Sequence, residues 1–190
     1  MIREAAKIIK SGGVIVYPTE TVYGLGANAL DEQAICRVFE IKRRPLNMPI
    51  SLAVSSMEMV HKVAELSRND SFLLEKLLPG PISVLVKKKR IVPGLLTAGS
   101  PLVGIRFPEH EIAMKIIDLS GPITSTSANR TGCTPPVSVE EISPRIKEKA
   151  DLVLDGKKSK YAQPSTLVDI PNRKIIREGA GLDRAIKAIS

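Results

Sequence analysis

The sequence lacks the residues on which disulfide scaffolds, cysteine-based metal sites and covalent catalysis depend. Its 190 residues contain only two cysteines, Cys36 and Cys133, which lie far apart and form no C-x-x-C pair. A disulfide framework and a cysteine zinc site are therefore excluded. The two histidines, His61 and His110, have no partner motif, so no Ser-His-Asp or Cys-His arrangement is assigned. An enzyme with this sequence would work by positioning substrates and stabilising charge.

Aromatic residues and long apolar runs are also scarce. With no Trp, three Tyr and three Phe, the chain has too few rings for a platform that stacks unpaired bases. No run approaches the ~18 apolar residues of a membrane span, and charged residues interrupt the first positions, where a signal peptide would be apolar. We therefore expect a cytoplasmic protein with no membrane partner.

Positive charge is the clearest bias in the composition. Lys and Arg number 28 against 20 Asp and Glu, which gives a net charge of +8 and an isoelectric point near 9.6. This balance favours an anionic partner such as tRNA, ATP or another phosphate ligand. At ~100–200 residues per domain, the length predicts one domain over residues 1–190. Hydrophobic residues make up 43% of the chain, which is enough to build a core.

Helical and strand-like apolar patterns alternate along the chain, without the strict rhythm of a parallel β-α-β sheet. They predict an α/β domain around a mixed sheet. Ser55-x-x-Glu58 and Ser138-x-x-Glu141 match the capping-box pattern, so each is expected to open a helix. Helices are expected at 2–9, 31–39, 58–66, 72–78, 109–119 and 182–189, and strands at 14–17, 50–54, 82–86, 102–107, 123–126, 152–154, 165–170 and 174–177.

The first segment that can carry chemistry is Y-P-T-E-T-V-Y-G-L-G at residues 17–26, directly after an expected buried strand. Thr19 and Thr21 place hydrogen-bonding side chains at the end of that strand, while Gly24 and Gly26 allow a ligand to approach the backbone closely. A polar turn with glycines for geometry explains the segment equally well. The segment is neither a Walker loop nor a G-x-G-x-x-G fingerprint, so those motifs do not support nucleotide binding here.

Basic residues at the ends of expected elements form a second set of candidates. Lys42 and Arg44, two positions apart before Pro45, are spaced to reach one phosphate group, although the helix dipole also favours cations at a helix C-terminus. Arg106 closes an apolar strand and is either a solvated strand end or a clamp for a carboxylate. Arg177 ends a later expected strand.

A run of hydroxyl side chains continues from the strand expected at 123–126. Residues 124–129 read T-S-T-S-A-N, and such groups are costly to bury without partners. They suit a loop that hydrogen-bonds phosphate or ribose, and a plain Ser/Thr turn is the alternative. Ser165 opens a further strand, and residues 156–163 (GKKSKYAQ) are the best candidate for a mobile loop.

Taken in order, these segments resemble a known family. The succession Y-P-T-E-T-V-Y-G-L-G, K-R-R-P, L-P-G-P-I-S, V-G-I-R-F-P, S-T-S-A-N-R-T-G and S-T-L-V-D is similar to that of the YrdC/Sua5 family of L-threonylcarbamoyladenylate synthases, over residues 2–181. The resemblance implies a single YrdC-like domain with a twisted mixed sheet, flanking helices and a basic concave face. It also implies the formation of threonylcarbamoyl-AMP and pyrophosphate from L-threonine, bicarbonate and ATP, with Mg2+ carried in by ATP. A downstream transferase would then use the product to make N6-threonylcarbamoyladenosine (t6A) in tRNA.

The resemblance further implies a role for each matching residue. The catalytic cations would be Lys42 and Arg44. L-Threonine would be bound by Thr19, Thr21, Arg106, Ser127 and Ser165. ATP would be bound by Lys42, Arg44, Ser125, Asn129 and Arg177. No metal ligand is assigned on the protein. Independently of the resemblance, the lability of the carbamate favours a closed pocket, and residues 156–163 are the candidate lid.

Two other functions fit parts of the sequence. An RNA-binding module without catalysis would need the net charge of +8 but not the threonine, serine and asparagine constellation. A carbamoyl-adenylating relative from hydrogenase maturation would share the domain, but those chains are long and carry Cys-rich zinc segments. With 190 residues and two cysteines, this chain lacks such segments.

Overall fold

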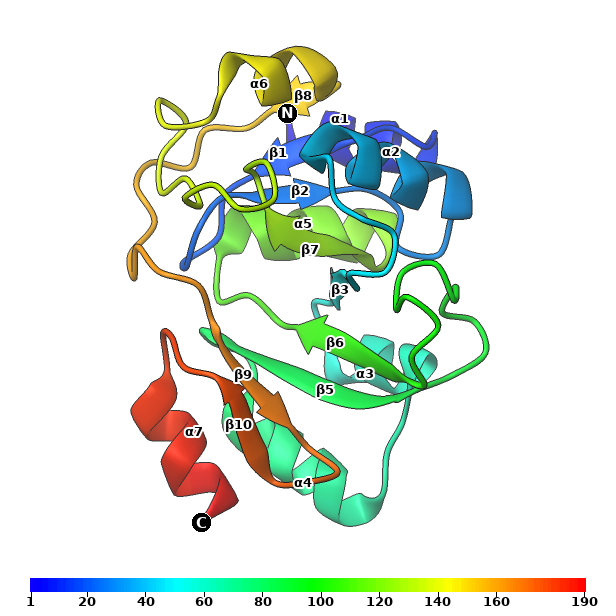
Figure 1. The fold of residues 1–190 in the computed structure, drawn as a ribbon, viewed down its shortest axis with the longest axis vertical. Helices are drawn as coiled ribbons and strands as arrows, with labels where there is room; N and C mark the ends of the chain where they lie inside the picture. Colours follow the sequence, from blue (N-terminus) through cyan, green and yellow to red (C-terminus); the bar gives the residue numbers. More distant parts are fainter.

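The short apolar runs of the chain pair into one ten-stranded mixed sheet (Figure 1). The computed structural model describes all 190 residues. The strands are β1 (Ile15–Tyr17), β2 (Gly24–Gly26), β3 (Ser51–Ala53), β4 (Ala64–Glu65), β5 (Ile82–Lys88), β6 (Leu102–Arg106), β7 (Ile123–Ser127), β8 (Leu152–Val153), β9 (Thr166–Asp169) and β10 (Lys174–Arg177). Their order is β10-β9-β5-β6-β3-β7-β2-β1-β8, with β4 paired to β5 outside this path.

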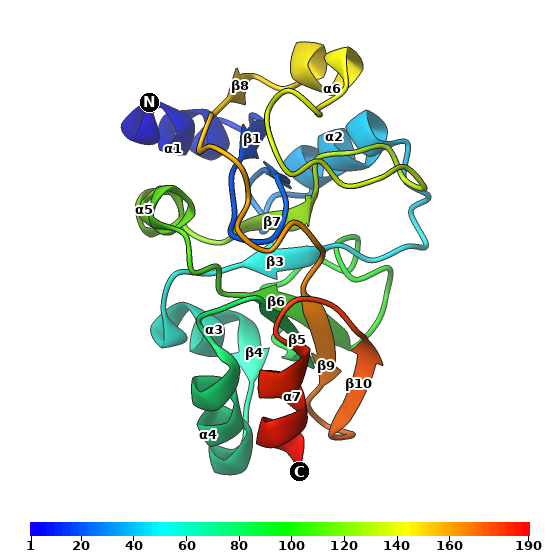
Figure 2. The ribbon, with the colours of Figure 1, turned by 90° about the vertical axis from the view of Figure 1, so that its left-hand side faces the viewer.

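Seven helices flank the sheet. They are α1 (Ile2–Lys10), α2 (Glu32–Lys42), α3 (Met57–Val63), α4 (Arg68–Leu77), α5 (Glu111–Ser120), α6 (Pro144–Lys149) and α7 (Leu182–Ile189). In Figure 2, α1, α3, α4 and α5 lie to one side of the sheet, and α2 and α6 lie to the other near its upper end. None of these helices is long and apolar enough to cross a lipid bilayer. The predicted α/β class, a mixed sheet flanked by helices, is confirmed.

Strand β3 joins the two halves of the sheet. It pairs in parallel with β6, where Ala53 faces Arg106, and antiparallel with β7, where Ser51 faces Ser125. Two of the predicted ligand-binding residues are thus placed on either side of one short strand. The half formed by β8, β1, β2 and β7 meets the half formed by β6, β5, β9 and β10 at this junction.

The first strand shows why the sheet is apolar throughout. Val14 and Val16 belong to the larger core cluster, whereas Ile15 and Tyr17 belong to a second cluster beneath α1 and α5. Because successive side chains of a strand point to opposite faces, a strand covered on both faces needs a continuous apolar run. The continuous apolar run at residues 14–17 therefore indicates that both faces of β1 are buried.

Local capping signals were predicted correctly at one helix and wrongly at two others. Asp31 caps α2, as its carboxylate accepts the backbone N–H groups of Gln33 and Ala34. Helix α3 is capped by Ser56 rather than Ser55. No helix opens at Ser138, because the Glu141 carboxylate accepts the Val137 N–H instead, and α6 begins further on, with Pro144 in its first turn.

The two glycines of the Y-P-T-E-T-V-Y-G-L-G segment pack closely against a buried tyrosine, and Gly24 also lines the cavity described below. Both lie in β2, and the Tyr17 ring of the neighbouring strand occupies the space where their side chains would be. A Cβ on Gly24 would lie 2.9 Å from Tyr17 Cε1, and one on Gly26 would lie 3.0 Å from the same atom. Their lack of a side chain therefore leaves room for the Tyr17 ring.

The substitution Gly24→Ala is expected to lower the free energy of unfolding by about 1–3 kcal/mol, because the added methyl group overpacks the Tyr17 ring. Urea unfolding with matched m-values measures this loss. Gly94→Ala is the control, since a Cβ there meets nothing within 4 Å. Equal midpoints for the two variants would contradict the packing argument.

Candidate active site

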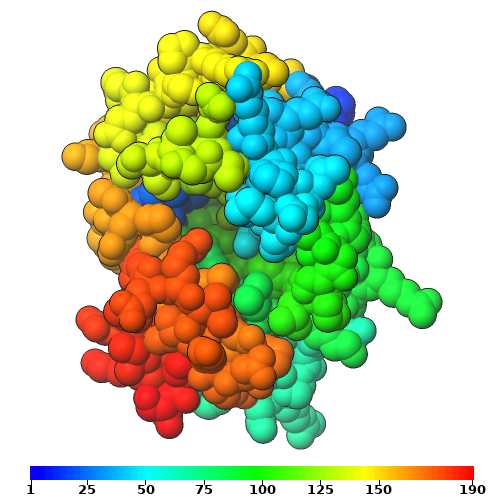
Figure 3. Space-filling view, viewed as in Figure 1, coloured from blue at the N-terminus to red at the C-terminus, as the bar shows by residue number.

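A cavity of about 500 Å³ opens at the junction of the two halves of the sheet. It is lined by 25 residues, drawn mainly from the segment after β1, the segment before β3, and strands β5, β6, β7 and β9. Figure 3 shows the hollow between the segment after α2, in cyan, and the orange and red segments near the C-terminus. A volume of this size is typical of sites for small molecules and cofactors.

Arginines and hydroxyl groups give this cavity its chemistry. Its charged lining residues are Arg44, Arg106 and Arg177, and no Asp, Glu, Lys, His or Cys lines it. The hydroxyl groups come from Tyr17, Thr19, Thr21, Tyr23, Ser51, Ser83, Thr97, Ser100, Ser125, Thr126, Ser127 and Ser165. The structure holds no group of three or more His, Cys, Asp or Glu side chains suited to a metal ion. Three cations among neutral donors favour an anionic ligand.

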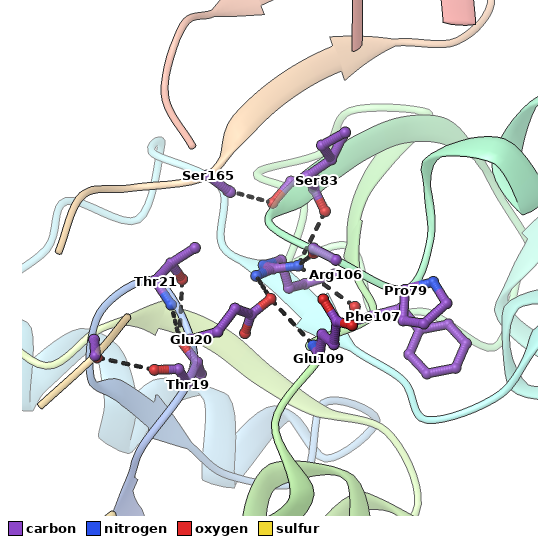
Figure 4. Close-up of polar contacts among 12 residues, drawn as sticks. Thr19, Glu20, Thr21, Pro79, Ser83, Arg106, Phe107, Glu109 and Ser165 are labelled. Carbon is purple, nitrogen blue, oxygen red and sulfur yellow. Dashed lines mark hydrogen bonds and ion pairs between the residues drawn. The ribbon is translucent and has the colours of Figure 1, made fainter. Parts of the chain in front are cut away.

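Arg106 is the most buried of the three arginines. Its Nη2 lies 2.5 Å from Glu20 Oε1, and its Nη1 donates to the carbonyls of Gly80, Ile82 and Phe107 (Figure 4). Its side chain is 5% exposed, as is that of Glu20. The sequence left open whether Arg106 is a solvated strand end, and burial excludes that alternative.

Thr19 and Thr21 form a linked pair beside this ion pair. The Thr19 hydroxyl donates to the Val22 carbonyl over 2.6 Å, and the two threonine hydroxyl oxygens lie 2.9 Å apart. Because the Thr19 hydroxyl donates its proton to the Val22 carbonyl, Thr21 is the donor in the hydrogen bond between the two hydroxyl groups. The Thr21 oxygen keeps its lone pairs, so it can accept a hydrogen bond from a ligand.

Ser165 and Arg177 meet at the opposite wall, next to Ser83, to which the sequence analysis assigned no role. Ser165 Oγ lies 2.7 Å from Ser83 Oγ, and Arg177 Nη2 donates to the Ser165 carbonyl over 2.9 Å. Burial, and to a lesser degree the charge of Arg106, lowers the pKa of Arg177. Ser83 ends the L-P-G-P-I-S segment that contributes to the family resemblance, but it was assigned no role there, and its other signal was a single hydroxyl within the apolar run of β5.

Lys42 and Arg44 do not face the same space. Arg44 lines the cavity and donates to the Met48 and Pro49 carbonyls, at 3.0 and 2.8 Å. Lys42 lies outside the lining, and its Nζ donates to the Ser127 carbonyl and, over 2.8 Å, to the Asn129 carbonyl. The prediction that both cations reach one phosphate group directly is not what the geometry shows. Lys42 instead fixes the loop that follows β7.

The hydroxyl-rich loop is likewise divided between cavity and support. Ser125 and Ser127 line the cavity, whereas Asn129 does not. The Asn129 side chain accepts a hydrogen bond from Ser127 Oγ and donates to the Cys133 carbonyl. Eight of the ten predicted site residues are thus brought together, and Lys42 and Asn129 support them from behind.

Residues 156–163 pack against the T-E-T segment. The Tyr161 N–H donates to the Glu20 carbonyl over 2.8 Å, and Ser159 Oγ donates to the Thr19 carbonyl over 2.9 Å. The Tyr23 hydroxyl donates to the Lys157 carbonyl over 2.7 Å. The tract expected to be mobile is therefore held to the segment that carries Thr19 and Thr21.

Fold and cavity together define an α/β protein with a cavity lined by arginines and hydroxyl groups. The Sua5/YciO/YrdC family model, which carries the description "Telomere recombination", matches residues 7–179. The chain belongs to this family.

Named relatives agree with this assignment. The threonylcarbamoyl-AMP synthase of Pyrococcus abyssi is 39% identical over 171 residues, which cover 89% of this chain and 50% of the relative. The putative threonylcarbamoyl-AMP synthase of Methanocaldococcus jannaschii is 38% identical over 175 residues, 91% of this chain and 83% of the relative. The chain thus spans about half the length of the Pyrococcus synthase.

A solved structure matches closely as well. The crystal structure of Pyrococcus abyssi Sua5 complexed with L-threonine superposes with a TM-score of 0.93 at 37% sequence identity. The match covers 100% of this chain and 57% of that one. The described fold is therefore that of the family.

Burial of Lys42 generates a prediction for stability against pH. Desolvation first, and the charge of Arg44 second, lower the pKa of Lys42 from 10.5 to about 7. Between these two values the unfolded chain binds a proton that the folded chain does not, so stability rises with pH. The difference in unfolding free energy between wild type and Lys42→Met is expected to increase from pH 7 to pH 10, measured by denaturant unfolding. A difference that stays flat over this range would show that Lys42 keeps its ordinary pKa.

Proposed function

We propose that this chain is an L-threonylcarbamoyladenylate synthase, which forms threonylcarbamoyl-AMP and pyrophosphate from L-threonine, bicarbonate and ATP. The observation that carries this proposal is the cavity itself, with three arginines, many hydroxyls and no acidic, thiol or imidazole side chain in its lining. The names of the relatives support the same activity. A crystal structure of one relative, Pyrococcus abyssi Sua5, is described as a complex with L-threonine.

The reaction explains why such a cavity needs cations. The threonine amine first combines with bicarbonate to give a carbamate and water. A carbamate oxygen then bonds to the α-phosphorus of ATP, while the bond between the α-phosphorus and the bridging oxygen breaks and pyrophosphate leaves. Both partners in this second step are anions, so positive charge must offset their repulsion. Mg2+ enters bound to the ATP phosphates and supplies part of that charge.

The lining residues divide between the two substrates. Arg106, near the T-E-T segment, binds the threonine carboxylate, while Thr19, Thr21, Ser127 and Ser165 supply hydrogen bonds to the same substrate. A site that hydrogen-bonds the threonine hydroxyl strongly excludes apolar analogues. An analogue without the hydroxyl would leave buried polar groups of the site unpaired.

A second set of residues binds the nucleotide. Arg44 and Arg177 bind the ATP phosphates, and Ser125 hydrogen-bonds the nucleotide. Lys42 and Asn129 act on it by holding the loop of residues 127–129 in place. The product would feed a downstream transferase that makes t6A in tRNA.

The activity is tested by pyrophosphate release from the purified protein with MgATP, in the presence and absence of L-threonine and bicarbonate. Release that needs both is expected. Arg44→Ala is expected to reduce turnover by about two orders of magnitude while the protein stays folded, because a cation beside the reacting phosphates is lost. Arg68→Ala, an exposed arginine of α4, is the matched control. Release that ignores threonine, or full turnover of Arg44→Ala, would contradict the assignment.

A contact with RNA is favoured by a separate group of arginines. Arg43, Arg130 and Arg145 form no ion pair and no side-chain hydrogen bond. They lie near one another, because the Thr131 N–H donates to the Lys42 carbonyl and α6 packs on α2. The charges of Arg145 and then Arg130 lower the pKa of Arg43. The segments that carry Arg43 and Arg130, light blue and yellow-green in Figure 3, border the hollow.

Three unneutralised arginines suit the phosphate backbone of RNA, so we place tRNA contact here. Each of Arg43→Gln, Arg130→Gln and Arg145→Gln is expected to reduce the slope of log affinity against log salt by about 1, as measured by titration with tRNA. Arg68→Gln is expected to leave the slope unchanged. Equal slopes for all four variants would show that the arginine group does not contact RNA.

A further inference from the structure

Glu20 is the one acidic residue that forms an ion pair with an arginine of the cavity. The sequence showed it only as the middle residue of T-E-T, and the proposed reaction gives it no role. Its side chain is 5% exposed and lies behind the cavity, since Thr19 and Thr21 line the wall and Glu20 does not. It therefore acts on the site through its neighbours.

The contacts of Arg106 show what Glu20 adds. Nη1 donates to three carbonyls, all from residues in or next to β5 and β6, which belong to the same half of the sheet as Arg106. Nη2 donates to Glu20, which comes from the β1–β2 segment in the other half. Nε donates to no protein group, so Nε–H and the second Nη2 hydrogen are left for a ligand. Glu20 is the only contact that fixes the guanidinium on its Nη2 side.

Glu20 is itself held in place from two directions. Its Oε1 also accepts the Glu109 N–H over 3.1 Å, and its backbone carbonyl accepts the Tyr161 N–H over 2.8 Å. Figure 4 shows the Glu20 carboxylate directed between the Arg106 guanidinium and the turn at Glu109. A carboxylate anchored in this way holds its partner at a defined angle.

We propose that Glu20 is a positioning residue, which orients the free N–H groups of Arg106 toward the carboxylate of the amino-acid substrate. The inference rests on the proposed function for the identity of that substrate. The orientation of Arg106 by Glu20 does not depend on it. Because an arginine binds a carboxylate best through two parallel N–H groups, a rotated guanidinium would lose one of them.

The unpartnered oxygen of Glu20 allows position to be separated from charge. Oε2 is buried and has no hydrogen-bond partner. In Glu20→Gln the amide oxygen can take the place of Oε1, and the amide nitrogen can occupy the position of Oε2 without displacing a donor. This variant keeps the geometry and removes the charge. Glu20→Asp does the reverse, because its carboxylate is one methylene short of Arg106.

The first experiment compares KM for L-threonine and for MgATP in pyrophosphate release. Glu20→Gln is expected to keep KM for threonine within about fivefold of wild type, the effect of weakening a single hydrogen bond. Glu20→Asp and Glu20→Ala are expected to raise it by at least about tenfold, because the carboxylate clamp is misplaced, with KM for MgATP nearly unchanged. Glu109→Gln is the matched control, since its exposed side chain is outside the network.

Three outcomes would overturn the proposal: an unchanged KM for threonine in Glu20→Asp, a Glu20→Asp variant that performs better than Glu20→Gln, or equal increases in KM for both substrates. The middle outcome would mean that charge rather than position matters. If Glu20→Ala fails to fold, the comparison of Glu20→Gln with Glu20→Asp is sufficient to test the positioning role.

A second experiment needs no activity. In 15N NMR spectra, the Nη2 group of Arg106, assigned with Arg106→Lys, is expected to rotate slowly about the Cζ–Nη2 bond in wild type and Glu20→Gln and to average in Glu20→Asp. Nη1 is expected to stay slow in all three, because its carbonyl partners do not involve Glu20. Slow rotation of Nη2 in all three would overturn the positioning role. If wild type released no pyrophosphate but showed this pattern, the proposed function would fail while the role of Glu20 in orienting Arg106 would stand.

Discussion

The buried charge of Arg106 is the constraint around which the rest of the site is arranged. A charged side chain that is only 5% exposed is tolerated only when it is paired and hydrogen-bonded, since desolvation costs several kcal/mol. Three carbonyls of one half of the sheet and the Glu20 carboxylate from the other half meet this requirement. Satisfying a single charge therefore also fixes the two walls of the cavity relative to each other.

The other polar groups of the site follow the same logic of mutual satisfaction. Lys42 donates hydrogen bonds to the carbonyls of Ser127, at the end of β7, and of Asn129, in the loop that follows. These bonds hold the end of β7, where Ser127 lines the cavity. Ser83 and Ser165 bond to each other, and Arg177 bonds to the Ser165 backbone. These contacts hold donors in place before any ligand arrives, which lowers the cost of ordering them on binding. A fixed set of cationic and neutral donors of this kind favours an anionic ligand.

The sequence predicted eight of the ten strands, because their signals are local, and missed the short strands β2 and β4. The apolar run at residues 14–17 and the Asp31 cap each depend on neighbours a few positions away. Predictions failed where two local solutions competed. Ser138 matches a capping box, but the Glu141 carboxylate binds the Val137 N–H in a turn instead. The packing of Gly24 against Tyr17 was not predicted, because strand pairing alone brings the Tyr17 ring to it.

The sequence by itself determined the chemical character of the site: an excess of cations, hydroxyl-rich segments at strand ends, and ordered motifs that match one family. Only the tertiary structure decided which of these groups share the cavity. Lys42 and Arg44 are two positions apart, yet one is turned to backbone carbonyls and the other to the cavity. Glu20 and Arg106 are 86 positions apart, and no sequence pattern marks them as partners. Their pairing follows from the spatial order of the strands in the sheet. Contacts between distant parts of the chain are set by the topology of the sheet and not by distance along the chain.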